Sequence, residues 1–380
     1  MSKLAWLRIA LTDGLGPVLS ARLIEASGSV DAACDASLKL LKSIEGIGSK
    51  RAETIHQSLI ASRDGAVREL EQADKLGVKI VSLSEQDYPT LLKSIPAAPP
   101  VLWTRGEFLD RDMNGIGIVG SRKCSVYGRE QSERFGAGLA GIGMTIVSGG
   151  ARGVDTHAHR GAMIPANGRT IAVLGCGVDI AYPPENEKLL AQITERGAVV
   201  SDFPLNTPPV AENFPRRNRL ISGLARGVLV IEADVKSGAL ITARYANEEH
   251  NRPVFAIPGR VDNPLSAGPH RLIRDGAILV ETMSDLLDNL GTIPIDVSNV
   301  YANEDAPEDL FPEAQSKPID STLTDRQRKI VDAIEDESSI ESITERTELP
   351  VNIVMQELTM LSIRGAITRV SGQNYRRKSR

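Results

Sequence analysis

The residues best suited to chemistry in this sequence are glycines, serines and arginines gathered in two short turns. Gly120-Ser121-Arg122-Lys123 and Ser148-Gly149-Gly150-Ala151-Arg152-Gly153 each lie at the end of a short apolar run. Glycine lets a backbone approach an anion, and the N–H groups of such a turn and of a following helix point toward it. The pattern predicts phosphate binding, although an isolated Gly-Ser-Arg could also be only a tight turn. The candidate contacts are Gly120, Ser121, Arg122, Lys123, Ser148, Gly149, Gly150 and Arg152, with Arg122 as the first choice.

A second group of candidates is cationic. The stretch from Phe214 to Arg226 contains four arginines and no acidic residue. Arginine is a common partner of DNA phosphates, so the stretch favours phosphate binding, with a solvated helix face as the alternative. Its candidate contacts are Phe214, Arg216, Arg217, Asn218 and Arg219. Aromatic residues make up only 4% of the chain, so base stacking would depend on a few rings, of which Tyr127, Tyr182 and Phe214 are the plausible ones.

Other polar residues in these motifs favour structural roles. Asp155 and Thr242 are expected to be helix caps, because Asp and Thr near helix starts accept hydrogen bonds from free N–H groups. His157 and His159 are expected to pack on the sheet, since no recognised motif places a serine or cysteine nucleophile beside them. The sequence therefore predicts no catalytic residue.

The cysteines and the apolar runs indicate in which cellular compartment the protein is expected. Cys34, Cys124 and Cys176 lie far apart, and no histidine stands at metal-ligand spacing, so neither a disulfide framework nor a metal site is expected. The sequence has no apolar run of membrane-spanning length and no signal-peptide pattern at its start. We expect a protein of the reducing cytoplasm with no membrane partner.

The elements that must position these turns occupy residues 86–290. Apolar runs of strand type alternate there with amphipathic segments, among them Gly115–Val119, Arg169–Leu174 and Ala198–Ser201. This alternation predicts an α/β fold, a Rossmann-like, doubly wound and mostly parallel sheet. Because the carboxyl ends of parallel strands meet at one edge of a sheet, the glycine turns are expected to converge there.

Two smaller regions flank the sheet. Residues 1–85 are expected to be wholly helical, with helices at 4–11, 18–27, 37–43, 50–61 and 64–76. Within them, Ile44–Ala52 resembles a helix-hairpin-helix (SAM-like) unit, which either contacts a DNA phosphate or only packs. Residues 321–380 predict three helices and a two-stranded wing, the pattern of a winged helix. Protein contact or regulation is favoured there over base readout, because the recognition helix carries Glu357 and no Lys or Arg before Arg364.

The net charge of −5 does not exclude a polyanionic partner, because of where the charges lie. Residues 291–320 hold seven acids against Lys317 alone, a net of −6, which leaves about +1 for the rest of the chain. With four prolines and no sustained periodicity, this segment is expected to be an acidic, flexible linker.

Six motifs in one order resemble the DNA-processing protein A (DprA/Smf) family. Besides the two glycine turns and Phe214–Arg219, they are Ala158–Ala162, Tyr182–Asn186 and Lys236–Ala243. The resemblance implies a non-enzymatic, single-stranded-DNA-binding protein without a cofactor, which forms a homodimer through its Rossmann-like domain. It implies protection of incoming strands and loading of the RecA recombinase during natural transformation, the DNA uptake of competent cells. It also adds Lys236, Ser237 and Gly238 as candidate contacts. Gly268-Pro269-His270 departs from the family pattern and weakens any contact inferred for that loop.

A rival interpretation is an enzyme, a nucleotide phosphoribohydrolase similar to the lysine-decarboxylase-like family. Such proteins carry a catalytic glutamate after a glycine-rich turn, and Tyr245 stands at the corresponding place here. Glu248 and Glu249 follow one helical turn later and are expected to face elsewhere. A nucleotide sensor with no polymer partner is a third possibility, which the arginine-rich stretch disfavours.

Overall fold

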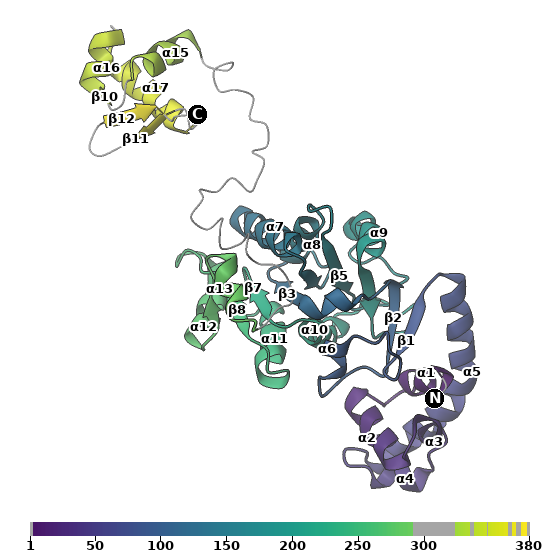
Figure 1. Cartoon of the computed structure of the whole chain (residues 1–380). Coiled ribbons are helices and arrows are strands. Elements are labelled where there is room, and N and C mark those ends of the chain that lie inside the picture. The colour runs from purple at the N-terminus through teal and green to yellow at the C-terminus, as the bar shows by residue number, and fades with distance from the viewer. Residues whose placement is uncertain are drawn as a thin grey trace. The chain divides into compact units, whose positions relative to one another are not determined.

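The computed structural model describes residues 3–291, 324–334, 338–347, 349–363, 367–369 and 374–377. The chain divides into two compact units, residues 1–305 and 306–380 (Figure 1). The first holds the large sheet and the N-terminal helices, and the second holds a small sheet with three helices.

The first unit is built on a nine-stranded sheet with the order β1-β2-β6-β5-β4-β3-β7-β8-β9. From β6 to β9 all neighbours pair in parallel, whereas β2 pairs antiparallel with β6 and β1 with β2. The strands are β1 (Lys79–Ser82), β2 (Val101–Gly106), β3 (Gly115–Val119), β4 (Thr145–Ser148), β5 (Arg169–Val173), β6 (Ala198–Ser201), β7 (Val228–Val230), β8 (Val254–Ala256) and β9 (Ile278–Leu279). The predicted mostly parallel α/β sheet is confirmed. The order reverses at β3, and such switch points are where ligands bind in this class of fold.

Helices cover both faces of this sheet, as a doubly wound fold requires (Figure 1). One face packs on α7, α8 and α13, and the other on α6, α10 and α11. The helices are α6 (Thr90–Lys93), α7 (Val126–Gly141), α8 (Val154–Ala162), α9 (Glu187–Arg196), α10 (Asn213–Gly223), α11 (Ala239–Arg244), α12 (Ala267–Arg274) and α13 (Met283–Leu287). Strand residues alternate between the two layers: Ile116 and Ile118 belong to one core, and Val119 belongs to the other.

The N-terminal helices share a continuous core with one side of the sheet. This core joins α1 to α5 with side chains of β1, β2 and α9 and of the loop after β5. The Glu69 carboxylate of α5 accepts hydrogen bonds from the Trp103 indole N–H at 2.9 Å and the Leu205 backbone N–H at 2.8 Å. The helices are α1 (Lys3–Ala10), α2 (Pro17–Ser27), α3 (Val30–Cys34), α4 (Leu38–Ser43) and α5 (Ser49–Lys75).

Two details of this region differ from the sequence prediction. Lys79–Ser82 forms strand β1, so the expectation of wholly helical structure up to residue 85 is wrong for these four residues. The helices predicted at 50–61 and 64–76 are one helix of 27 residues, α5. Gly65 lies inside it and costs about 1 kcal/mol relative to alanine. Buried side chains on both sides of it, including Ile55, Leu59 and Ala73, pack the helix continuously.

The second unit has the predicted winged-helix elements. They are α15 (Asp325–Asp332), β10 (Ser338–Ser339), α16 (Ile340–Thr347), α17 (Val351–Ile363), β11 (Ile367–Arg369) and β12 (Asn374–Arg377), with the sheet order β10-β12-β11. In α17, Glu357 accepts a hydrogen bond from the Gln327 side chain at 2.8 Å. The predicted flexible linker, apart from residue 291, and Arg364 lie outside the described residues, as does the tail after Arg377.

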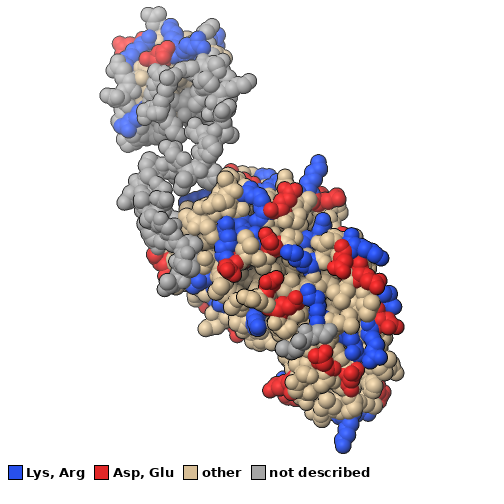
Figure 2. Space-filling view, turned by 45° about the vertical axis from the view of Figure 1, so that its right-hand side comes forward, with Lys and Arg blue, Asp and Glu red and all other residues tan. Residues whose placement is uncertain are grey.

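Charges of both signs are interspersed on the face of the molecule that Figure 2 shows. Within the described ranges, no helix combines the length and apolar character needed to cross a bilayer. Because the charges on the face in Figure 2 are mixed, a nucleic-acid site on that face would depend on local geometry more than on a broad basic field.

Candidate functional site

A small pocket opens at the carboxyl ends of β3, β4 and β5, the edge of the sheet that we call the rim. Its free space is about 340 Å³, including the open volume at its mouth. We call it the rim pocket. It is lined by Arg122, Gly149, Ala151, Arg152, Leu174, Gly175, Cys176, Tyr182, Pro183 and Phe214.

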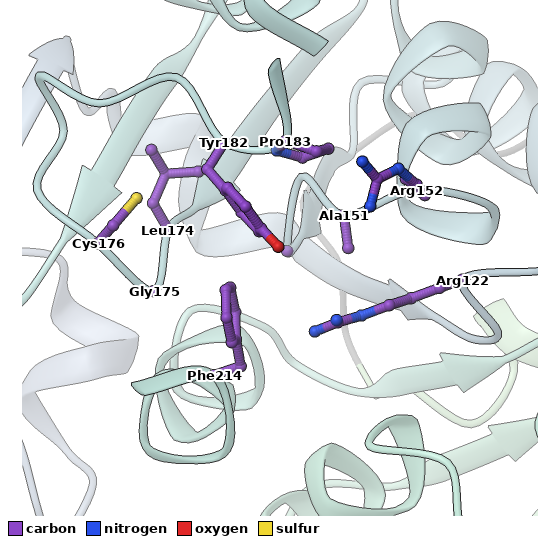
Figure 3. A pocket seen from close by; sticks show the side chains of 10 residues that line it. Arg122, Ala151, Arg152, Leu174, Gly175, Cys176, Tyr182, Pro183 and Phe214 are labelled. Carbon is purple, nitrogen blue, oxygen red and sulfur yellow. The ribbon is translucent and has the colours of Figure 1, made fainter. Parts of the chain in front are cut away.

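Two aromatic rings and one guanidinium dominate this pocket. Tyr182 and Phe214 point toward each other from opposite sides, and Arg122 extends toward Phe214 from a third (Figure 3). The ring centroids are 5.5 Å apart with a tilt of 36°, and the Arg122 guanidinium lies 5.0 Å from the Phe214 centroid. A cation on an aromatic face is attracted by the ring quadrupole. Phe214 therefore supports a positive charge at the pocket while its ring stays partly exposed.

The Gly-Ser-Arg turn is held by Glu232, which follows β7. The Glu232 carbonyl accepts from the Ser121 backbone N–H at 2.6 Å. Its carboxylate accepts from the Ser125 backbone N–H at 2.7 Å and from the Ser125 hydroxyl at 2.6 Å. Ser125 is the N-cap of α7, and Glu232 is only 2% exposed. The expectation that this helix start faces a foreign anion is therefore wrong, because a buried carboxylate of the protein occupies it.

The Ser-Gly-Gly turn is filled in the same way. The buried Asp155 carboxylate accepts from the backbone N–H groups of Gly149 at 3.1 Å and Ala151 at 3.3 Å. The N-cap of α8 is Gly153, so the prediction that Asp155 caps a helix is wrong. Burial raises the pKa of this carboxyl group. A Cβ on Gly149 would lie 2.6 Å from Asp155 Oδ2 and 2.7 Å from Arg217 Nη1, so only glycine fits between the two charged groups.

Arg217 lies beneath the pocket instead of on its surface. It is 3% exposed, and its Nη1 donates to the carbonyl oxygens of Gly149 at 2.6 Å and of Val173. Burial lowers the pKa of its guanidinium to about 10, against the attraction of Asp155. The prediction that Arg217 contacts DNA phosphate is not compatible with this position. Its charge is directed to two buried carbonyls that hold the rim together.

Arg219 is a second correction. Its guanidinium forms a buried ion pair with Asp202 and donates to the Ala97 carbonyl at 2.6 Å, so it is not available to a phosphate. The helix α10 begins at Asn213, before the arginine-rich stretch, and most of its residues are buried. Of the neighbouring candidates, Arg216 is exposed and lies over Phe203, and Asn218 donates to the Gly238 carbonyl at 3.1 Å.

The structure brings together only part of the predicted phosphate site. Four candidates line the rim pocket: Arg122, Gly149, Arg152 and Phe214. Others shape the turns around it, namely Gly120, Ser121, Ser148 and Gly150, and Lys123 is exposed beside Arg122. Lys236, Ser237 and Gly238 follow β7 and do not line the pocket. Tyr127, a stacking candidate, also lies outside it and donates to the Pro258 carbonyl at 3.0 Å.

Arg152 is paired with a carboxylate at the edge of the pocket. Its Nη2 and Nε donate to Glu185 Oε1 at 2.6 and 3.1 Å, and both side chains are more than half exposed. The next residue, Asn186, is buried and donates to the Gly150 carbonyl at 2.9 Å and to Thr156 Oγ1 at 2.8 Å. These bonds fix the segment that carries Tyr182 against the Ser-Gly-Gly turn.

Sequence reasoning missed the roles of Glu185 and Glu232 in this site. A signal for Glu232 was present, since it directly follows an apolar strand and therefore reaches the same rim as the glycine turns. Glu185 lies within the Tyr182–Asn186 motif, but nothing in a single sequence shows that it meets Arg152, 33 positions away.

The remaining polar candidates have structural surroundings. His159 is buried against β5 with its Nδ1 2.6 Å from Thr170 Oγ1, and burial lowers its pKa to about 3. His157 Nδ1 lies 2.6 Å from Glu133 Oε1. Thr242 is buried within α11, whose N-cap is Gly238, so the prediction that it caps a helix is wrong. Tyr245 begins a π-helical turn, Tyr245–Glu249, on which Glu248 and Glu249 are exposed.

Three family models match this chain. The model described as DNA recombination-mediator protein A matches residues 79–291, more than half of the chain. A SAM-like helix-hairpin-helix tandem matches residues 11–59, and a DprA winged helix domain matches residues 313–373. The order of the three agrees with the order of the elements described above.

Individual relatives extend this match over nearly the whole sequence. Protein Smf of Synechocystis is 36% identical over 396 residues, which cover 98% of each chain. The X-ray structure of DNA processing protein A from Streptococcus pneumoniae superposes with a TM-score of 0.65 at 31% identity, covering 77% of this chain and 99% of that one. DNA processing protein A from Helicobacter pylori, whose structure is described for its single-stranded DNA binding mode, gives a TM-score of 0.50 at 27% identity and covers 56% and 95%.

Proposed function

This chain belongs to the DNA recombination-mediator protein A family, DprA or Smf, and from that premise we propose that it binds single-stranded DNA at the rim pocket. The observation that carries the proposal is the Arg122 guanidinium held over Phe214, with Tyr182 beside it. A partly exposed aromatic pair offers a stacking surface for an unpaired base, and an adjacent cation suits the phosphate attached to it. Bases inside a duplex are stacked on each other, so such a site favours single strands.

The contacts in this proposal are fewer than the sequence suggested. Arg122 and Arg152 are the phosphate-binding side chains at the pocket, and the exposed cations Lys123, Arg216 and Lys236 contribute to the surrounding field. The turn residues Gly120, Ser121, Ser148, Gly149 and Gly150 bring these groups into place. Asn218 is bonded to Gly238, next to Ser237, outside the pocket lining. Arg217 and Arg219 support the site from the interior.

A binding role is better supported than the rival hydrolase. No carboxylate is among the residues that line the rim pocket. The nearby Asp155 and Glu232 are buried in hydrogen bonds to backbone N–H groups, and Glu185 at the pocket edge is paired with Arg152. We extend the binding role to the protection of incoming strands and the loading of RecA during DNA uptake. That extension is supported by family membership. The loading role is tested by measuring RecA filament formation on single strands coated with the protein, which should be faster than on strands without it.

The proposal is tested by one titration of single- and double-stranded DNA of the same sequence. We expect tighter binding of the single strand and a linear fall of log K with log salt, with a slope of about −0.7 for each neutralised phosphate. Equal affinity for both forms would contradict it. In parallel, incubation with nucleoside monophosphates should release no free base, whereas release would favour the hydrolase.

Replacing Arg122 by Ala is expected to weaken binding to every oligonucleotide and to flatten the salt slope by about 0.7, because one phosphate contact is lost. Fluorescence anisotropy of a labelled strand at several salt concentrations measures both. Arg160→Ala is the matched control, since Arg160 is exposed near the end of α8, which begins at the rim and runs away from it. If a folded Arg122→Ala protein showed the same salt slope as Arg160→Ala, Arg122 would not be a phosphate contact.

We also propose that the protein forms a homodimer through its Rossmann-like domain, as the family resemblance implies, and that the end of the sheet provides the contact. Much of the apolar sequence over residues 277–290 is internal, since Val280, Leu286 and Leu290 are buried in the core. What remains is Leu279, 43% exposed on β9, the last strand of the sheet and thus an open edge. Sedimentation of the whole protein should show a dimer, and Leu279→Lys should shift it toward monomer. Wild-type protein that stays monomeric at all accessible concentrations would overturn the dimer.

A further inference from the structure

Three carboxylates of the protein occupy positions at the rim where an external anion would otherwise bind. Glu232 accepts from the N-cap of α7, Asp155 accepts from the Ser-Gly-Gly turn, and Glu185 accepts from Arg152. Each satisfies cationic or N–H groups that would suit a phosphate oxygen equally well. The rim therefore contains its own anions before any DNA arrives.

These carboxylates differ in whether they are able to move. Glu232 and Asp155 are 2% and 7% exposed, and their partners include backbone N–H groups fixed in tight turns. Displacing either would leave a buried charge without its donors, which costs several kcal/mol. Glu185 is different, because its side chain is 61% exposed and that of Arg152 is 53% exposed. Both groups regain water when they separate, and exposed ion pairs are weak.

Resting on the proposed function, we propose that Glu185 is an internal competitor for the DNA phosphate at Arg152, and so a specificity-determining residue of the rim pocket. In the free protein Glu185 holds Arg152 at the pocket edge. When a strand binds, a phosphate replaces the carboxylate on the guanidinium, and Glu185 turns into solvent. No covalent bond changes in this exchange.

The surrounding contacts restrict this exchange to the side chain of Glu185. Asn186 is buried and bonded to Gly150 and Thr156, so the backbone beside Glu185 is fixed to the Ser-Gly-Gly turn. Tyr182, on the same segment, stays packed against Phe214. Release of Arg152 therefore requires a new rotamer of Glu185 and leaves the aromatic wall in place.

The exchange has a consequence for which ligands bind well. Because one anion replaces another on Arg152, the contact adds little for an isolated phosphate. A strand that is already held at Arg122 and Phe214 presents its next phosphate at a high effective concentration, and so competes successfully. Glu185 thus favours polymeric strands over inorganic phosphate or mononucleotides.

The test compares Glu185→Gln with Glu187→Gln by anisotropy titration of a labelled single strand over a range of salt. Glu187 is an exposed carboxylate two residues further on, at the start of α9. Its replacement by Gln removes the same charge as Glu185→Gln but leaves the partner of Arg152 unchanged. We expect Glu185→Gln to bind roughly two- to five-fold tighter than Glu187→Gln. Its salt slope should be steeper by up to about 0.7, because no carboxylate is freed to take up a cation when the phosphate binds.

A double-mutant comparison separates the ion pair from general charge effects. In an Arg152→Ala background, Glu185→Gln should act no more strongly than Glu187→Gln, since the group that both anions seek is gone. If Glu185→Gln bound DNA no more tightly than Glu187→Gln, the competitor role would be wrong. The proposed DNA site would still stand if Arg122→Ala weakened binding in the same assay. Wild-type protein without single-strand binding would overturn both the proposed function and this inference.

Discussion

Replacing Arg217 by Ala is expected to lower the free energy of unfolding by about 3–5 kcal/mol, the usual cost of removing one partner from a buried charged cluster. The substitution leaves the Gly149 and Val173 carbonyls without their donor and deprives buried Asp155 of a nearby positive charge. Urea unfolding followed by circular dichroism measures the change. The Ser-Gly-Gly turn and the end of β5, which both lie at the pocket, should loosen, so DNA binding should fall with stability.

Arg216→Ala is the matched control for this prediction. Arg216 is the preceding residue on the same helix, but it is exposed and lies over the Phe203 ring. Its replacement should change the free energy of unfolding by no more than about 0.5 kcal/mol. If Arg217→Ala were as stable as Arg216→Ala yet bound DNA with a flatter salt slope, Arg217 would be a phosphate contact after all.

Replacing Phe214 by Ala is expected to weaken single-strand binding by about 1–3 kcal/mol, or about 5- to 150-fold, because one base loses its stacking partner. Phe214 carries no charge, so the salt slope should stay that of the wild type even though affinity falls. This separates it from Arg122→Ala, in which the slope itself changes. Anisotropy titrations at several salt concentrations distinguish the two.

Two further variants sharpen the Phe214 experiment. Phe214→Tyr keeps a ring beneath Arg122 and should retain most of the affinity, because stacking depends on the aromatic face. Tyr127→Ala removes the other rim tyrosine, which lies outside the pocket and is bonded to Pro258, and should have little effect. If Tyr127→Ala weakened binding more than Phe214→Ala, the strand would follow a different part of the rim.

The sheet could be predicted from the sequence because each of its buried strands is a local signal. Gly115–Val119 and Ala198–Ser201 are short apolar runs bounded by glycines or polar residues, and both appear as strands with those bounds. Strand β1 escaped prediction because Lys79–Ser82 closely follows the long helix α5 and contains only two apolar residues, Ile80 and Val81. It is defined mainly by its antiparallel pairing with β2, which lies some twenty residues away.

The arginine-rich stretch shows why the site was less predictable than the fold. Its composition indicates cations, but whether a cation faces solvent depends on partners that are distant in sequence. Arg219 forms an ion pair with Asp202, and Arg217 donates hydrogen bonds to the carbonyls of Gly149 and Val173. Arg122 lies at the pocket as predicted because it follows β3 closely, and the carboxyl end of that strand lies at the rim.

The core that α1 to α5 share with the sheet bears on how modular this protein is. Leu174 and Cys176 line the rim pocket, and both belong to the core to which Trp6, Leu59 and other side chains of the N-terminal helices contribute. One wall of the pocket is therefore held in place by packing against the N-terminal helices. The N-terminal helices are then not an interchangeable attachment. A relative that replaced them would have to rebuild the support behind that wall, so the two parts are expected to change together in evolution.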